Sequence, residues 1–308
     1  MSLNAAARAL VDEFRSRPVQ RAGSLIITLY GDAIAPRGGT VWIGSLIRVL
    51  ADFGISERLV RTSMYRLAKD GWLVADQIGR RSYYQLTDEG AERFHEATQR
   101  IYGEPRQSWS GEWCLVLTGA VPSEQRDAVR KELSWLGFGP VSVDVMARPA
   151  PDIEDLETML VRLRVANEVV VMRARATESQ RNDVLINFVR DSWNLADIEA
   201  RYEVFSERFL PVLAAVRKAR TIEPCIAFQI RTLLLQEYRK LLLRDPILPA
   251  ELLPKHWHGL QAYQLCRDLY QRVHAAADEY LSATMETADS PLPPPMPEFY
   301  ERFGGLDR

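Results

Sequence analysis

The chain has 308 residues, of which 47% are hydrophobic, and a formal net charge of −2. This length and apolar content suffice for two or three separate hydrophobic cores. The near-neutral charge argues against indiscriminate binding of polyanions, so any contact with nucleic acid must come from locally concentrated basic residues. No apolar run approaches the roughly 20 residues that a membrane helix needs, and a signal-peptide pattern is missing, so we expect a cytoplasmic protein.

The sequence predicts neither a disulfide nor a metal site. Its three cysteines are widely spaced in apolar or helical contexts, which favours buried free thiols. They are Cys114, Cys225 and Cys266. The four histidines do not have the spacing of metal ligands. We therefore expect no metal and no cofactor.

The first elements in chain order are a leading helix predicted at Ser24 to Ala35 and a short strand at Val41 to Ile43. Ser45 is expected to cap a short amphipathic helix. Gly54 then supplies a tight turn before Ser56, the next N-cap. This order of helix, turn and helix predicts a helix-turn-helix.

The stretch from Ser56 to Gly71 has the profile of a recognition helix. Its inner stripe is Val60, Met64 and Leu67. The opposite, basic face consists of Arg58, Thr62, Tyr65 and Lys69, flanked by Arg61 and Arg66. A basic face on a single amphipathic helix is more often a solvated surface than a reader of nucleic acid, but the neighbouring elements favour DNA binding here.

Two strands follow the recognition helix, at Trp72 to Ile78 and at Ser82 to Leu86. Gly79-Arg80-Arg81 supplies the turn between them, so the hairpin is a wing with a basic tip. Trp42 and Trp72 are expected in the core of this small domain. The sequence therefore predicts a winged helix-turn-helix.

A helix that enters the major groove with its N-terminus directs its first residues at base edges. Here these are Arg58, Arg61 and Thr62, and arginine is suited to bidentate contact with guanine. Tyr65 lies further along the same face.

Lys69 and the wing pair Arg80 and Arg81 are expected at phosphates, where they position the protein and make binding salt-dependent. For Arg66 a surface ion pair with Asp70, four residues on, is an equal alternative to DNA contact. One monomer reads only a few base pairs, so we expect a homodimer on a palindromic operator.

The middle of the chain alternates strands and helices. After a helix at Asp88 to Tyr102, capped by Thr87, the polar segment Gly103 to Gly111 with Pro105 is a predicted hinge. The predicted strands are Trp113 to Val121, Val141 to Ala147 and Glu168 to Ala176, with a short strand around Phe138, and the helices are Ser123 to Leu136 and Ile153 to Leu163. This alternation favours an α+β sandwich of ferredoxin-like type.

From about Gln180 only helical patterns remain. The predicted helices are Arg181 to Ser192, Asp197 to Ala219, Ile222 to Leu243 and Gly259 to Met285. The proline-rich Ser290 to Pro297 cannot continue a helix and is expected to be an extended arm or a loose end. The expected domains are thus a winged helix at 1–102, a ferredoxin-like domain at 103–178 and a helical domain at 179–308.

Two separated blocks of the chain resemble the PaaX family, repressors of bacterial phenylacetate catabolism. The first comprises Ser24 to Asp32, Arg37-Gly38-Gly39, Gly54 to Glu57, Val60 to Thr62, Arg66 to Leu73 and Gly79 to Tyr84. The second comprises Glu237-Tyr238-Arg239, Leu243 to Pro246, Leu248-Pro249, Leu252 to Pro254, Trp257, Gly259 and Leu269-Tyr270. The resemblance implies a winged helix, a Cas2-like (ferredoxin-like) central domain and a helical C-terminal domain. It also implies a dimeric repressor that phenylacetyl-CoA releases from DNA.

The binding site of such an effector is not visible as a motif, because neither a P-loop nor a GxGxxG appears where a strand meets a helix. A CoA thioester needs cations for its phosphates and an apolar slot for its acyl group. By composition alone, the effector candidates are Arg231, Tyr238, Arg239, Lys240, Arg244, Trp257 and Tyr270. Helix packing is the alternative role of the aromatic residues, and the alternative for Arg244-Asp245-Pro246 is to hold a turn.

Two other functions stay open at the level of sequence. A related regulator that senses a different aromatic acyl-CoA or acid would share every feature above. A Cas2-like nuclease would need a metal-binding carboxylate near the end of its first strand, but no carboxylate follows Glu112 there, and Asp144 has no evident acidic partner. No GxSxG motif indicates hydrolysis, so we expect that the protein is not an enzyme.

Overall fold

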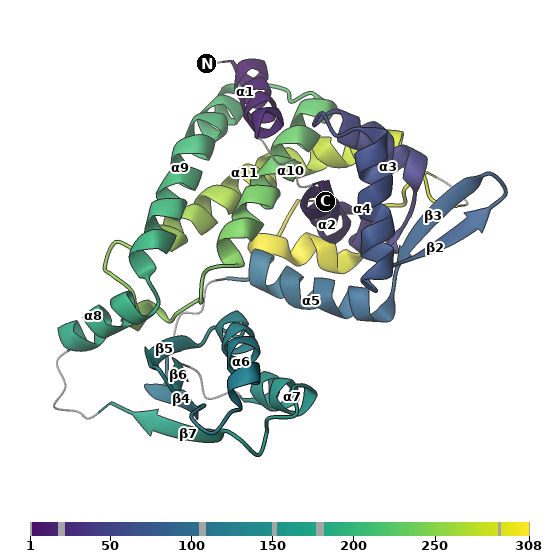
Figure 1. The fold of residues 1–308 in the computed structure, drawn as a ribbon. Coiled ribbons are helices and arrows are strands. Elements are labelled where there is room, and N and C mark those ends of the chain that lie inside the picture. The colour runs from purple at the N-terminus through teal and green to yellow at the C-terminus, as the bar shows by residue number, and fades with distance from the viewer. Residues whose placement is uncertain are drawn as a thin grey trace. The chain divides into compact units, whose positions relative to one another are not determined.

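The computed structural model describes residues 2–17, 22–104, 109–149, 153–176, 182–288 and 291–307. The chain forms two compact units, which are described separately below (Figure 1). The first unit is Met1–Glu104 with Val204–Lys240 and Gln261–Arg308, and the second is Pro105–Glu203 with Leu241–Leu260. The helices of the C-terminal third are thus divided between the two units, and the three predicted domain boundaries stay predictions.

The N-terminal part of the first unit is a winged helix. Its elements are α1 (Leu3–Ser16), α2 (Ala22–Leu29), β1 (Thr40–Trp42), α3 (Ile43–Ala51), α4 (Glu57–Lys69), β2 (Leu73–Ile78), β3 (Arg81–Leu86) and α5 (Asp88–Tyr102). The three strands form an antiparallel sheet in the order β1-β3-β2. The predicted helix-turn-helix and wing are therefore confirmed.

The turn between α3 and α4 forms as its residues predict. Gly54 has a φ of +74°, a left-handed conformation that favours glycine. The side chain of Ser56 caps α4 by accepting a hydrogen bond from the backbone N–H of Leu59 at 3.4 Å. In the same way Thr87 caps α5 through the N–H of Gly90 at 2.9 Å.

Two predictions for the first helices are wrong. Helix α3 begins at Ile43, and Ser45 lies inside it, where its buried hydroxyl accepts a hydrogen bond from the N–H of Glu286 at 3.0 Å. The hydroxyl binds a distant segment, which local sequence cannot show. The leading helix does not run unbroken, because α2 ends at Leu29 and is followed by a π-helical turn at Tyr30–Ile34 and a 3-10 turn at Ala35–Arg37.

The second unit contains a ferredoxin-like sheet. Its elements are β4 (Glu112–Leu117), α6 (Ser123–Trp135), β5 (Gly139–Ser142), β6 (Val145–Arg148), α7 (Glu154–Arg162) and β7 (Val170–Arg175). The strand order is β5-β6-β4-β7, with antiparallel neighbours. Cys114 and Val116 of β4 pack with Leu133 of α6 and Leu156 of α7 in the core. This βαββαβ arrangement confirms the predicted fold class.

The strand predicted at Val141 to Ala147 is wrong in its extent. It is a tight hairpin of β5 and β6, with a turn at Val143-Asp144, and β5 begins beside Phe138, where a short strand was expected. The first strand also ends at Leu117 instead of Val121, because the segment after it turns toward α6. The alternation of valine with Ser142 and Asp144 is that of a single strand, so it does not reveal where the hairpin reverses.

The long helices of the C-terminal third are confirmed. They are α8 (Asn182–Ser192), α9 (Leu195–Lys218), α10 (Pro224–Leu242) and α11 (His258–Thr284). Pro105 in the predicted hinge, Arg181 at the predicted start of α8, and Ser290 lie outside the described residues. No described helix is long and apolar enough to cross a membrane.

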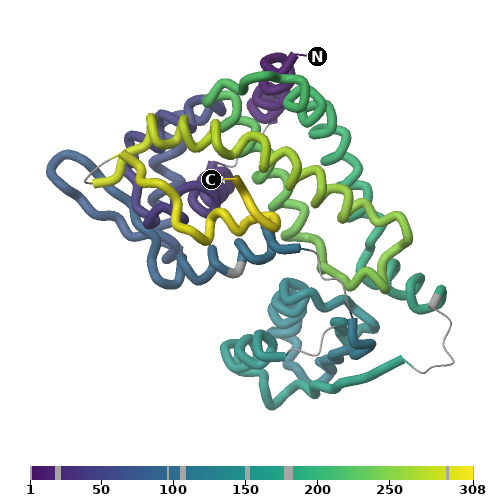
Figure 2. Tube along the Cα trace, turned by 180° about the vertical axis from the view of Figure 1, so that it is seen from behind, coloured from purple at the N-terminus to yellow at the C-terminus, as the bar shows by residue number. Residues whose placement is uncertain are grey.

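After α11 the chain forms an extended arm in the first unit (Figure 2). Leu292 is buried and donates its N–H to the carbonyl of Met285 at 2.9 Å, and the N–H of Met296 bonds the carbonyl of Pro36 at 2.8 Å. A 3-10 segment at Pro297–Gly304 follows. The described part of the proline-rich stretch is therefore an ordered arm, the first of its two predicted forms.

Candidate nucleic-acid interface

The helix α4 presents one apolar and one basic face, as its sequence predicts. Val60, Met64 and Leu67 are buried toward the rest of the winged helix. The candidate DNA-binding residues on this helix are all exposed, namely Arg58, Arg61, Thr62, Tyr65, Arg66 and Lys69. The Tyr65 side chain is 68% exposed, which is unusual for a tyrosine that serves only packing. The structure thus brings these side chains together on one solvent-facing surface.

Some of these side chains already have partners. The Arg61 guanidinium forms an ion pair with Glu57 one turn earlier, at 2.7 Å. The hydroxyl of Thr62 donates to the carbonyl of Arg58 at 2.8 Å. Both members of the Arg61 pair are more than half exposed, so the pair is weak and can be replaced by a DNA contact.

Four basic residues of the candidate interface form no ion pair with a carboxylate within the described ranges. They are Arg58, Arg66, Lys69 and Arg80. In particular, the alternative pair of Arg66 with Asp70 does not form. Among the described residues, none of these four cations has to leave a carboxylate first, so each can contact a phosphate without breaking an ion pair.

The wing is a hairpin whose turn contains Gly79, with a φ of +61°, and the exposed Arg80. At the turn end of the wing, Arg81, the first residue of β3, lies over the ring of Trp42, 4.2 Å from its centroid. Arg48 of α3 lies over the same ring at 5.6 Å. Trp42 is therefore half-buried between two guanidinium groups, and Trp72 is likewise half-buried, with Arg93 4.9 Å from its ring centroid. The prediction of two core tryptophans is wrong, because cations cover faces that an apolar core would cover.

Glu286, just after α11, links Arg81 of the wing and Arg48 of α3 to the end of α11. Its carboxylate bonds Arg48 at 3.0 Å and Arg81 at 2.9 Å, and its carbonyl accepts from the N–H of Trp42 at 2.9 Å. Hydrogen bonds from Arg48 and then from Arg81 hold the pKa of Glu286 below its usual range. Glu286 would thus compete with the phosphate contact that is predicted for Arg81.

This competition predicts the effect of removing the Glu286 charge. In the Glu286→Gln variant we expect slightly tighter binding to DNA of any sequence and a steeper loss of affinity with salt, since Arg81 is then free for a phosphate. Fluorescence anisotropy with a labelled duplex at several salt concentrations measures both. Glu279→Gln removes an exposed carboxylate from α11 that forms no ion pair in the described structure. Equal affinities of the two variants would contradict the competition.

Behind the interface, the first unit contains a buried ion cluster around Asp32. Its carboxylate accepts hydrogen bonds from Tyr102 at 2.9 Å and Tyr270 at 2.8 Å, and pairs with Arg231 at 2.7 Å and Arg302 at 3.0 Å. These groups come from α5, α11, α10 and the C-terminal segment. Burial acts to raise the pKa of Asp32, but Arg231 and Arg302 outweigh it and hold the pKa below its usual range.

The cluster predicts a loss of stability in acid. The folded protein gains stability from the ionised Asp32 above the usual aspartate pKa of about 3.9 and loses it as the pH falls through the lower folded-state pKa. We expect urea unfolding to become easier between about pH 5 and about pH 2, and to depend less on pH in Asp32→Asn. The same pH dependence in both proteins would contradict this role of the carboxylate.

Two of the effector candidates belong to this cluster. Arg231 is fully buried and also pairs with Asp278 at 2.6 Å, and Tyr270 is fully buried. Their polar groups are bonded to other parts of the protein, so a ligand would have to open the cluster to reach them.

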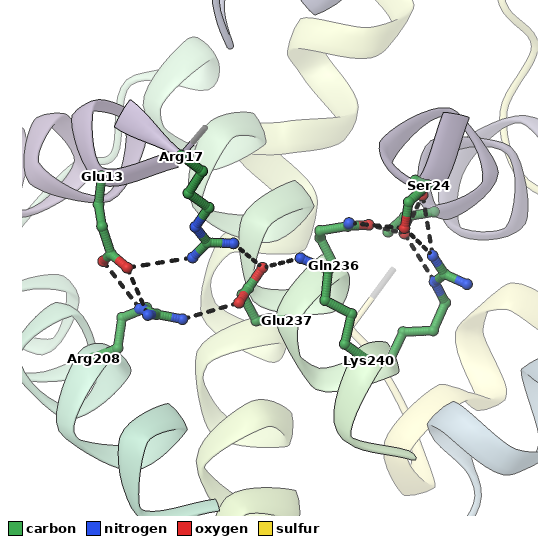
Figure 3. Close-up of polar contacts among 9 residues, drawn as sticks. Glu13, Arg17, Ser24, Arg208, Gln236, Glu237 and Lys240 are labelled. Carbon is green, nitrogen blue, oxygen red and sulfur yellow. Dashed lines mark hydrogen bonds and ion pairs between the residues drawn. The ribbon is translucent and has the colours of Figure 1, made fainter. Parts of the chain in front are cut away.

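Three further effector candidates, Tyr238, Arg239 and Lys240, lie on α10. Figure 3 shows the polar contacts around Glu237 and Lys240 of this helix and around Ser24. Arg239 donates to the hydroxyls of Ser24 at 2.8 Å and Thr28 at 3.0 Å in α2. Lys240 pairs with Glu237 at 2.8 Å. The carboxylate of Glu237 also binds Arg17 and Arg208, while Tyr238 is buried, with its ring centroid 5.7 Å from that of Phe205. The contacts of Arg239 and Tyr238 therefore hold α10 against its neighbouring helices.

Arg244 and Trp257 belong to the second unit. The carboxylate of Asp245 accepts from the N–H of Ile247 at 2.6 Å and from the hydroxyl of Tyr202, which holds the turn after α10. Trp257 lies edge-on to Tyr202, with ring centroids 5.8 Å apart. The seven effector candidates are therefore divided between the two units, and their role stays a prediction.

Sequence reasoning missed Asp32, Arg302 and Glu286. The signal for Asp32 was available, since it is a lone carboxylate that follows the apolar run of α2. A carboxylate in that position is either exposed or paired inside the protein. Arg302 and Glu286 had no such signal, because their partners lie more than 200 residues away.

A winged helix with a basic recognition helix, joined in one chain to a ferredoxin-like sheet and long helices, defines a multidomain winged-helix protein. Three family profiles match it, namely the PaaX-like protein at residues 21–90, the PaaX protein central Cas2-like domain at 106–186 and the PaaX-like protein C-terminal domain at 193–283. The transcriptional repressor PaaX of Escherichia coli strain K12 is 40% identical over 285 residues, which cover 92% of this chain and 90% of the relative. The chain belongs to the PaaX family.

The curated relative is named as a transcriptional repressor, which agrees with the expectation that the chain is not an enzyme. Among solved structures, an uncharacterised protein from Mycobacterium tuberculosis matches with a TM-score of 0.48 and 24% identity. That match covers 76% of this chain and 90% of the other.

Proposed function

We propose that this protein is a transcriptional repressor that binds its operator with α4 in the major groove and the wing against the backbone. The observation that carries the proposal is the exposed basic surface of α4 opposite a buried apolar stripe, with Arg58, Arg66 and Lys69 in no ion pair among the described residues. Identity of 40% with a repressor over nearly the whole chain supports it.

Within this proposal the side chains have distinct roles. Arg58, Arg61 and Thr62 lie in the first turns of α4 and read base edges. Lys69, Arg80 and Arg81 bind phosphates and set the register. Tyr65 and Arg66 extend the contact along the groove. A DNA-binding repressor of this kind acts in the cytoplasm.

The repressor acts as a homodimer on a palindromic operator. One α4 and one wing contact only a few base pairs, which does not suffice to select one site in a genome. Two symmetry-related copies double the length of sequence that is read, and a two-fold axis makes the operator a palindrome.

Phenylacetyl-CoA is the proposed effector, by analogy with the family's role in phenylacetate catabolism. Release requires that the effector prefer a conformation in which the two recognition helices no longer match the DNA. A regulator that senses a different aromatic acyl-CoA or acid is the alternative, and it shares the DNA-binding half of the proposal.

A gel-shift titration on the region upstream of the protein's own operon tests both halves. We expect specific binding that phenylacetyl-CoA reverses and free phenylacetate does not. Specific binding that neither compound changes would support the repressor function and reject phenylacetyl-CoA as the effector. Equal affinity for this region and for an unrelated duplex of the same length would reject the repressor.

A further inference from the structure

The second unit contains a cavity that none of the roles above uses. It has a volume of about 450 Å³ and is lined mainly by the end of α6, the start of α9 and the turn after α10. Its lining includes Lys131, Glu132, Trp135, Trp193, Asp197 and Arg244. The volume falls within the range of roughly 300 to 1,000 Å³ that small-molecule sites occupy.

One wall of the cavity is a fixed tryptophan. The indole N–H of Trp193 donates to the carbonyl of Gly137 at 3.2 Å, and the side chain is 8% exposed. The ring packs so closely on Gly139 that a Cβ there would lie 2.3 Å from it, which explains the glycine. Trp113 supports the ring with its centroid 6.0 Å away.

A second indole at the cavity is exposed. Trp135, the last residue of α6, has 58% of its surface accessible, although α6 buries other apolar side chains. A large flat ring that remains in water beside a cavity offers an apolar surface that a ligand can cover.

The charges around the cavity are unbalanced. Its two carboxylates already have cationic partners outside the lining, since Glu132 pairs with Arg162, and Asp197 with Arg201 at 2.8 Å. Lys131 and Arg244 line the cavity but form no ion pair with a carboxylate in the part of the chain that is described. The lining itself carries two cations and two carboxylates, but when Arg162 and Arg201 are included the cations outnumber the carboxylates four to two, which suits an anion.

We infer that this cavity binds an aromatic anion, with its flat group against the indoles of Trp135 and Trp193 and its negative charge toward Lys131 and Arg244. The inference rests on the proposed function and deepens it, because it makes this cavity the effector site. Free aromatic carboxylates and aromatic acyl-CoA thioesters share this chemistry. Of the seven effector candidates, only Arg244 lines the cavity.

Calorimetric titration of the full-length protein tests the inference, with phenylacetyl-CoA, CoA and phenylacetate as separate probes. The variants are Lys131→Gln, Arg244→Gln and Trp135→Leu. Lys255→Gln is the matched control, since Lys255 is an exposed lysine of the same unit that does not line the cavity. We expect Lys131→Gln and Arg244→Gln to raise the Kd of the aromatic anion roughly ten-fold or more, as a lost charge-assisted contact does. Trp135→Leu should raise it about three- to ten-fold, through the lost ring contact. The control binds like the wild type.

The probes distinguish a free aromatic carboxylate from an aromatic acyl-CoA thioester as the ligand. Binding of either phenylacetate or phenylacetyl-CoA supports the inference. Equal binding of CoA and its thioester would overturn the aromatic contact. Wild-type affinity for the aromatic anion in all three cavity variants would show that it does not bind in this cavity. That result would not contradict the proposed repressor function. A wild-type protein that binds its operator but none of the probes would overturn this site together with the proposed effector.

Discussion

Replacement of Asp32 by alanine is expected to lower the free energy of unfolding by about 3 to 5 kcal/mol, the range for removing one partner of a buried ion pair. The loss arises because the buried guanidinium groups that pair with Asp32 stay charged when its carboxylate is removed. Arg231 and Arg302 are 0% and 5% exposed; without Asp32, Arg231 keeps Asp278, but Arg302 has no carboxylate partner left among the described residues. Tyr102 and Tyr270 lose their acceptor at the same time. Urea unfolding followed by circular dichroism measures the loss.

Two further variants make this result interpretable. Asp12→Ala removes an exposed carboxylate from α1 and is expected to leave the free energy of unfolding nearly unchanged. Asp32→Asn keeps the size of the side chain but not its charge, so it should be almost as unstable as the alanine variant. If Asp32→Ala unfolds at the same urea concentration as Asp12→Ala, the cluster does not stabilise the fold.

Replacement of Arg58 by alanine is expected to weaken operator binding by about 1 to 3 kcal/mol, the cost of losing one contact to a base. Arg58 lies in the first turn of α4, is exposed, and has no carboxylate to release before it meets DNA. Its effect should therefore exceed that of Arg61→Ala, since Arg61 gives up its pair with Glu57 on binding. Fluorescence anisotropy with the operator duplex gives both affinities.

The control for this prediction is Arg8→Ala. Arg8 is an exposed arginine of α1 in the same unit, so its removal changes the net charge equally. Operator affinity should change little in that variant. If Arg58→Ala and Arg8→Ala bind the operator equally well, Arg58 is not part of the recognition surface.

The elements that sequence predicted well have local causes. The limits of α5 follow from the Thr87 cap at one end and Gly103 at the other, and α4 follows from Ser56 and a clear apolar stripe. Hydrogen bonds within a few residues fix these elements, so a short window contains the necessary information.

The errors come from contacts between distant segments. Ser45 looks like a helix cap, but its hydroxyl bonds Glu286. Trp42 looks like a core residue, but Arg48 and Arg81 cover its ring. Part of the candidate DNA surface was predictable because α4 and the wing are local in sequence, whereas the cavity at Trp193 requires three separate segments to meet.

The central claim is that α4 and the wing bind a specific operator. Footprinting of the region upstream of the protein's own operon, with wild-type protein and with Arg58→Ala, tests it most directly. The account predicts one protected palindromic stretch with the wild type, and loss of that protection in the variant at the same protein concentration. Absence of any protected stretch with folded wild-type protein, or unchanged protection with the variant, would contradict it.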